Sequence, residues 1–150
     1  MKLLMIFVGI FILILGAGRI WARAAKPPHL GVKNGLLSIL PDTPNCVSTQ
    51  DGSSEQRMAP MPYSGSQSDA QQKLLGIITK LSRCAIQEEK PGYIWVVYRS
   101  MVFGFPDDVE FLFDDEKKVI HFRAAARLGY FDMVVNRKRM EKISMQFEKS

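Results

Sequence analysis

The sequence contains few of the residues that usually build a catalytic or metal site. Only two cysteines, Cys46 and Cys84, and two histidines, His29 and His121, occur among 150 residues. The cysteines lack CxxC spacing and have no clustered histidines, so we expect no zinc site and no other cofactor. No recognised catalytic motif is present, and we assign no catalytic residue. The sequence therefore does not identify a reaction.

The chain also lacks a strong excess of positive charge in its globular part. The formal charge is +5, but Lys2, Arg19 and Arg23 belong to the N-terminal segment. Removing these three from the 20 basic residues leaves 17 against 15 acidic ones, a net charge of +2. A nucleic-acid binder would show a basic stripe with interleaved aromatic residues. The short basic run 137–139 is typical of the solvated face of a helix, and we predict no nucleic-acid partner.

The two cysteines leave two interpretations open. An exported domain permits a disulfide between Cys46 and Cys84, because disulfides persist in oxidising compartments. Alternatively, one or both thiols act as small buried hydrophobic groups. The spacing of the two residues in the sequence does not decide between these states.

A single long apolar run is present, and it lies at the N-terminus. Leu3 to Gly18 is uncharged and sixteen residues long, and Arg19 ends it. A bilayer-spanning helix needs ~20 residues, a length that residues 3–22 reach if Arg19 extends its charge to the interface. One interpretation is an uncleaved signal-anchor; the other is a cleavable signal peptide, since Ala22-Arg23-Ala24 fits the small-x-small cleavage pattern.

The flanking charges do not settle the orientation of this segment. Lys2 precedes the run alone, whereas Arg19, Arg23 and Lys26 follow it, which by positive-inside counting favours insertion with the domain in the cytoplasm. The short head and the apolar run are nevertheless typical of an export signal. We therefore predict a single-pass membrane protein whose domain faces the periplasm or another extracytoplasmic space. The alternative is a secreted or periplasmic domain released by cleavage near Ala24.

The rest of the chain divides into a linker and one domain. Residues 25–40 contain two prolines and two glycines and are expected to form a linker or an irregular lead-in, which could pack Leu36, Leu37, Ile39 and Leu40 on the domain edge. Residues 41–150 suffice for a single domain. Within it, 41–48 is expected to be a turn-forming segment and 49–67 an ordered loop.

Hydrophobic periodicity predicts an α+β domain. Apolar residues at helical spacing predict helices over 69–83 and 136–149. Alternating and β-branched residues between the helices predict four strands, over residues 85–89, 93–102, 107–113 and 118–126. Antiparallel strands between segregated helices favour a two-layer sandwich with a four-stranded antiparallel meander.

Four segments of this domain resemble a known family. They are Pro44 to Ser48 (PNCVS), Pro60 to Gly65, Gly104 to Phe111 (GFPDDVEF) and Arg123 to Arg139. In this order they resemble domain of unknown function 1499 (DUF1499), over about residues 41–145. The resemblance implies an envelope setting, often behind a membrane segment, and implies no reaction. Where the family often has serines, this chain has Ala124 and Ala126, which points to a packing role for those positions.

The segment around residues 123–139 contains the strongest candidate for a binding site. Arg123, Arg127 and Arg137 near the start of a helix suit a phosphate, a carboxylate or a lipid headgroup. We expect Asp108, Asp132 and Asn136 to complete this set. An anionic small molecule or lipid is therefore one predicted partner.

The same charged residues also fit a structural role across the sheet. If the turns centre on Gly104-Phe105 and near Asp115-Glu116, Arg99 lies opposite Glu110, Glu110 opposite His121, and Asp108 opposite Arg123. Such cross-strand pairs are common and contribute about 0.2–1 kcal/mol each. A one-residue slip would undo this register.

Three classes of function therefore stay open. A non-catalytic structural or interaction module of the envelope, which we favour, has its charged row paired and no cleft. A binding module has a pocket that holds unpaired arginines. A hydrolase-like enzyme has Cys46 or the Asp107, Asp108 and His121 group converging in a cleft.

Overall fold

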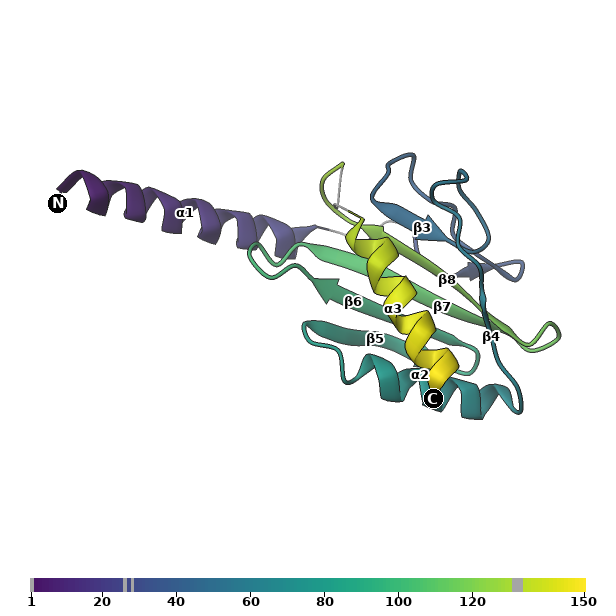
Figure 1. The fold of residues 1–150 in the computed structure, drawn as a ribbon. Helices are drawn as coiled ribbons and strands as arrows, with labels where there is room; N and C mark the ends of the chain where they lie inside the picture. The colour runs from purple at the N-terminus through teal and green to yellow at the C-terminus, as the bar shows by residue number, and fades with distance from the viewer. Residues whose placement is uncertain (1, 26, 28, 131–133) are drawn as a thin grey trace.

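The fold begins with a long apolar helix that extends away from the rest of the chain. The computed structural model describes residues 2–25, 27, 29–130 and 134–150. Helix α1 spans Lys2–Ala24, and its stretch Leu4–Ala22 is long and apolar enough to cross a membrane. A signal sequence meets the same criterion. Figure 1 shows α1 projecting from one end of a domain made of a sheet and two further helices.

The domain is built on an antiparallel sheet of six strands. The meander β5–β8 corresponds to the four predicted strands, in the bounds Cys84–Lys90, Tyr93–Arg99, Pro106–Asp114 and Val119–Ala126. Two short strands, β3 (Cys46–Ser48) and β4 (Met61–Pro62), both pair with β8. The path through the sheet is β3-β8-β7-β6-β5. The α+β class is confirmed, but the prediction of four strands was wrong, because segments expected to be turn and loop cover the edge of β8.

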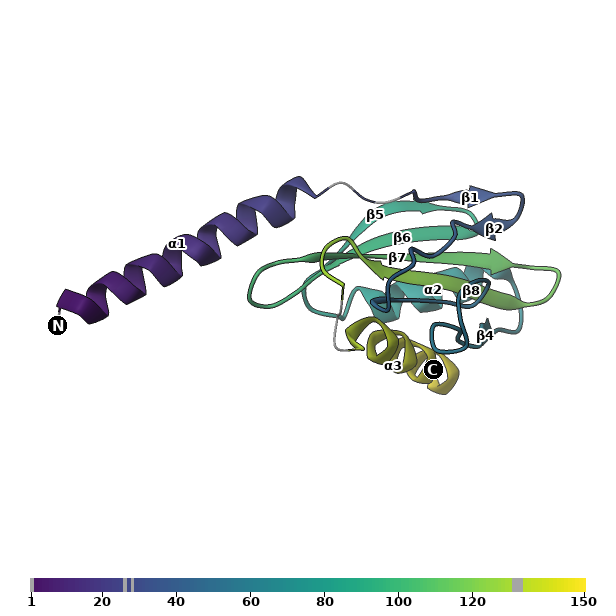
Figure 2. The same cartoon turned by 90° about the horizontal axis from the view of Figure 1, so that it is seen from above.

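Two helices cover one face of this sheet. Helix α2 spans Gln67–Ile78 and α3 spans Val135–Lys149. Ser66 caps α2 by accepting a hydrogen bond from the amide of Asp69. The apolar stripes of both helices meet the apolar face of the strands in one core, which includes Leu74, Ile78, Ile94, Val109, Phe111, Phe122, Ala124, Met140, Ile143 and Phe147. Figure 2 shows both helices on the same side of the strands.

The register of the meander differs from the prediction. Glu110 lies opposite Trp95 and Arg123, whereas Arg99 lies opposite Pro106. His121 lies opposite Leu112, and Asp108 opposite Ala125. The hairpins centre between residues 102 and 103 and between 116 and 117, not at the turn residues on which the prediction relied. Both shifts are even, so every side chain stays on its predicted face.

We call residues 25–40 the lead-in, and its described part from residue 29 onward lies over the second face of the sheet. This part contains a small hairpin of β1 (Val32–Lys33) and β2 (Leu36–Leu37), and Figure 2 shows it on the side opposite α2 and α3. The amides of Leu37 and Leu40 donate to Gln50 and Asp51, at 2.9 Å each. Both leucine side chains are buried. The folded unit therefore begins before residue 41.

The two cysteines are free and lie at opposite edges of the sheet. Cys46 is on β3 and Cys84 begins β5, the two outer strands of the sheet path. Three strands lie between them, and neighbouring strands are about 4.8 Å apart. The two cysteines are therefore much farther apart than the roughly 7 Å that a disulfide allows between Cα atoms. Of the two interpretations left open for the cysteines, the structure therefore favours free thiols over a disulfide. Cys46 is instead a buried small group that packs with Leu40 and Ala125.

Candidate functional site

Three ion pairs connect β7 to the segment that runs from β8 into α3. Asp107 pairs with Arg139 at 2.8 Å, Asp108 with Arg127 at 2.7 Å, and Glu110 with Arg123 at 3.4 Å. All three acidic residues belong to the GFPDDVEF segment, and all three arginines belong to the segment 123–139. The two motifs noted in the sequence are thus complementary halves of one set of contacts.

The pair of Asp108 and Arg127 lies on the second face and reaches the lead-in. Arg127 donates from Nε and Nη2 to the two carboxylate oxygens of Asp108, a bidentate geometry. Trp95 Nε1 donates to the same carboxylate at 2.9 Å. The remaining nitrogen of Arg127, Nη1, donates to the carbonyl of Ala25 at 3.0 Å. This pair therefore ties the end of α1 to the centre of the sheet.

Glu110 and Arg123 form the most deeply buried pair, and Glu110 also contacts the lead-in. Their side chains are 0% and 1% exposed. Glu110 accepts hydrogen bonds from the amide of Gly31 at 2.6 Å and from the hydroxyl of Tyr93 at 2.7 Å. Burial raises the pKa of Glu110, and the hydrogen bonds from Gly31 and Tyr93 and the charge of Arg123 oppose that rise. The Nε of Arg123 is buried without a hydrogen-bond partner.

The third pair lies on the helix side and fixes the start of α3. Arg139 donates to Asp107 and, at 2.6 Å, to the amide oxygen of Asn136, and its guanidinium lies over the ring of Tyr98. Asn136 donates in turn to the carbonyl of Asn45, and Asn45 to the carbonyl of Gly129. These contacts join the PNCVS segment to the first turn of α3.

The sheet divides the predicted ligand-binding set. Arg123, Arg127 and Asp108 face the lead-in, whereas Asn136 and Arg137 lie at the start of α3 on the other side. Asp132 lies outside the described residues. Arg137 donates to the carbonyls of Glu55 and Arg57. The structure thus does not bring the three arginines together around one ligand.

A cleft of about 470 Å³ lies at the start of α3. Its described walls include Cys46, Asn136 and Arg137, together with the loops that precede and follow β3. Among the residues that the structure describes, its charged lining consists of two carboxylates, Asp42 and Glu55, and one guanidinium, that of Arg137. This balance does not favour an anion over a neutral ligand or a peptide.

The residues of the hydrolase interpretation do not converge. Cys46 lies opposite Ala125 on β8. Ala125 is four residues from His121 along the same strand, a separation of about 13 Å. The Nδ1 of His121 is 3.1 Å from the hydroxyl of Thr49, and its Nε2 is 3.9 Å from Asp114. Burial lowers the pKa of His121 and raises that of the Cys46 thiol, so the thiolate is disfavoured.

The two aspartates of that interpretation point to opposite faces of the sheet. Asp107 meets α3, and Asp108 meets Arg127 below the lead-in. In the described part of the chain, no three histidine, cysteine, aspartate or glutamate side chains are placed to hold a metal ion. The geometry therefore offers no catalytic group of the kind the sequence suggested.

A comparison with protein families assigns this arrangement of residues to a family. The model of the protein family of unknown function DUF1499 matches residues 36–147. The chain belongs to the DUF1499 family. The match contains the six-stranded sheet, α2, all but the last two residues of α3, and all three ion pairs, but not α1. A search of curated proteins found no match to the chain.

Sequence reasoning missed the groups that complete the second-face contacts. Tyr93 and Trp95 on β6 supply donors to Glu110 and Asp108 on β7, and all four side chains lie on the same face of the sheet. The alternation of Tyr93 and Trp95 along β6 is a signal that could have identified them. Gly31 and Ala25 take part through a backbone amide and a backbone carbonyl, so their residue types could not predict these hydrogen bonds.

Proposed function

We propose that this DUF1499 protein is a membrane-anchored, non-catalytic interaction module of the cell envelope. Helix α1 holds it in the bilayer, and the domain faces the extracytoplasmic side. The observation that carries the proposal is the contrast between α1 and the charged groups. Most of the described apolar side chains of α1 from Leu4 to Trp21 are exposed, whereas Asp107, Asp108 and Glu110 of β7 are each paired with an arginine within the protein.

Two features support a module over an enzyme or an anion-binding protein. The arginines that could hold an anion, Arg123 and Arg127, are engaged by Glu110 and Asp108 below the lead-in. The cysteine that could serve as a nucleophile is buried and far from His121. The contacts through which such a module would act on a partner are then surface features, not the buried charges.

The first test measures membrane attachment of the full chain. Alkaline carbonate extraction of membranes should leave the wild-type chain in the pellet. Leu13→Arg places a charge in the centre of α1, which costs about 2.5–3.5 kcal/mol on insertion, and should release much of it. Lys117→Arg in the turn between β7 and β8 is the matched control and should change nothing. Wild type in the extracted fraction would contradict the proposal.

Two further measurements separate anchor from signal peptide and fix the side of the membrane. Mass spectrometry of the natural chain should find residues 1–24 present, whereas a chain that begins near residue 25 would show a cleaved signal. A membrane-impermeant maleimide should label Lys117→Cys in intact cells. Labelling only after the cells are lysed would place the domain in the cytoplasm.

A further inference from the structure

The hairpin between β6 and β7 carries an apolar tip at the end of the domain where α1 begins its projection. The tip, residues 100–105, has the sequence Ser-Met-Val-Phe-Gly-Phe. The side chains of Met101 and Val102 are 71% and 51% exposed. Apolar groups gathered in this way on a surface usually mark an interaction site.

The tip is an ordered turn, because its own hydrogen bonds define it. The amide of Ser100 donates to the carbonyl of Phe105 at 2.9 Å, and the amide of Phe105 donates to the hydroxyl of Ser100 at 2.9 Å. Gly104 closes the turn with a φ of +71°, a conformation that glycine adopts without strain. The chain thus holds Met101 and Val102 outward on a fixed scaffold.

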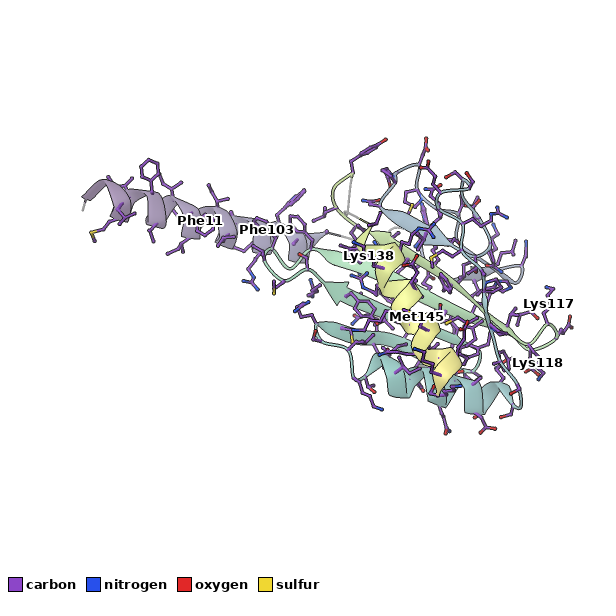
Figure 3. All side chains as sticks on the ribbon, in the orientation of Figure 1. Phe11, Phe103, Lys117, Lys118, Lys138 and Met145 are labelled. Carbon is purple, nitrogen blue, oxygen red and sulfur yellow. The ribbon has the colours of Figure 1, made fainter. Side chains whose placement is uncertain are left out.

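The tip lies directly against α1. The rings of Phe103 and Phe105 are stacked at 5.2 Å, and Phe105 meets Trp21 edge-on at 6.4 Å between centroids. A Cβ atom at Gly18 would lie 3.4 Å from the ring of Phe103. Figure 3 shows Phe103 beside α1, whereas Lys117 and Lys118 lie at the far end of the sheet.

These contacts set the depth of the tip relative to a bilayer that contains α1. The apolar stretch of α1 ends at Ala22, and Gly18 precedes it by four residues, or about 6 Å of helix. Phe103 is therefore level with a part of α1 that lies inside the membrane boundary. Groups of an interfacial element lie about 5–10 Å into the headgroup and acyl boundary, which is where this geometry puts the tip.

Arginines surround the tip. Arg19, Arg99, Phe103 and Gly104 line a hollow of about 370 Å³, and Arg83 joins Arg19 and Arg99 in a second one of about 310 Å³. Arg83 has a φ of +58°, and its carbonyl accepts from the amide of Arg99, so the two residues are side by side. The described lining of both hollows contains no carboxylate, and none of the ion pairs found in the described residues involves these three arginines.

We propose that the β6–β7 hairpin is a second membrane contact: its tip inserts among the lipid headgroups beside α1, and Arg19, Arg83 and Arg99 bind lipid phosphates. This inference rests on the proposed role of α1 as an anchor. Exposed apolar groups at the centre, aromatic rings at the boundary and cations around them are the arrangement that interfacial elements use. The domain is then seated on the bilayer at a fixed orientation, with the β7–β8 turn pointing away from it.

The test uses the full chain reconstituted in vesicles of equal parts phosphatidylcholine and phosphatidylglycerol. In a Cys46→Ala, Cys84→Ala background, one environment-sensitive fluorophore is attached at Met101→Cys, at Phe11→Cys on α1, or at Lys117→Cys as the distal control. Lipids that carry a nitroxide near the headgroup or along the acyl chain then quench each label. We expect a blue shift and loss of most emission at positions 101 and 11, and unchanged emission at position 117.

The outcomes distinguish the two proposals. Quenching at position 11 without quenching at position 101 would leave the anchor intact and overturn the second contact. Absence of quenching at both positions would overturn both. A blue shift at position 101 without lipid quenching would indicate contact with protein, such as a second copy of the chain, and would also overturn the lipid contact.

The role of the arginines is tested by charge removal. Each basic residue near an anionic surface changes the membrane-bound equilibrium by about fivefold. Arg83→Gln with Arg99→Gln should therefore reduce quenching at position 101 in the anionic vesicles, and much less in pure phosphatidylcholine. Lys117→Gln with Lys118→Gln removes the same charge at the far end and should have no effect. Equal results for the two double variants would overturn the assignment of phosphate contacts.

Discussion

The two faces of the sheet are both buried, but by different chemistry. The face below α2 and α3 is covered by aliphatic and aromatic side chains in one core. The face below the lead-in holds the pairs Glu110–Arg123 and Asp108–Arg127, which are nearly solvent-free. Apolar burial is non-directional, whereas the charged groups must each be matched by a donor or acceptor at a defined place.

The two faces of the sheet therefore have different structural roles. The apolar face stabilises the domain, as any α+β core does. The ionic face receives backbone groups of the lead-in, through Gly31 at Glu110 and Ala25 at Arg127. Buried charges therefore attach the segment that follows α1 at defined positions, and the comparison can be tested by breaking each face separately.

The largest effect is expected from Arg123→Met. Removal of one partner from a buried ion pair leaves the Glu110 carboxylate uncompensated and should lower the free energy of unfolding by about 3–5 kcal/mol. Denaturant unfolding of the full chain in detergent measures this change. The double variant Arg123→Met with Glu110→Gln should recover part of the loss. An additive double variant would contradict the coupling.

A smaller but more specific effect is expected from Arg127→Leu. Its loss removes charged hydrogen bonds to Asp108, which contribute about 1.5–3 kcal/mol, and also the contact with Ala25. Amide exchange should therefore accelerate in residues 29–40. Arg139→Leu breaks an ion pair on the helix side and is the matched control, since it should destabilise the protein without altering exchange in the lead-in.

A modest pH effect is expected from His121. Burial lowers its pKa from the ordinary 6.5, so the unfolded chain binds more protons in the range below that value. Its contribution to stability is present above pH 6.5 and is lost as the pH falls through the lowered folded pKa. Unfolding curves from pH 7 to pH 5 should show this loss in the wild type. His121→Gln should remove that part of the pH dependence, and an unchanged profile would contradict the buried neutral ring.

The smallest effect is expected from the thiols. Both are free, and burial raises the pKa of Cys46. In the Cys84→Ser variant, the remaining thiol should react with a disulfide reagent much more slowly in the folded chain than in urea. Unreduced wild-type protein should show two thiols after unfolding. A count of none would restore the disulfide.

The sequence predicted the elements that alternation and helical spacing define. The meander, both domain helices and the face of each strand residue follow from local patterns. The strand register was not predicted correctly. The prediction placed the turn centre at Gly104-Phe105, because glycine is a common turn residue, whereas the hairpin centres between residues 102 and 103. Strand β3 was missed since a three-residue strand gains its identity only from pairing with β8. Because β3 and β5 lie at opposite edges of the sheet, Cys46 is also too far from Cys84 for a disulfide.

The candidate site was predictable in its residue types but not in its partners. Asp108, Glu110 and Arg123 were expected to share one face, and they do. The interpretation of that face as open to a ligand was not compatible with the lead-in that covers it. Backbone donors such as the amide of Gly31 exist in every residue, so no composition signal marks the one that is used.

The most direct test of this account is amide hydrogen exchange of the full chain in lipid nanodiscs, resolved at the lead-in. If the ionic face receives this segment, the amides of Gly31, Leu37 and Leu40 should be protected in the wild type, and the amide of Gly31 should lose protection in Glu110→Gln. Exchange of all three amides at the rate of an unstructured peptide would contradict it, because the lead-in would then be a free linker and the buried arginines would be open to a ligand.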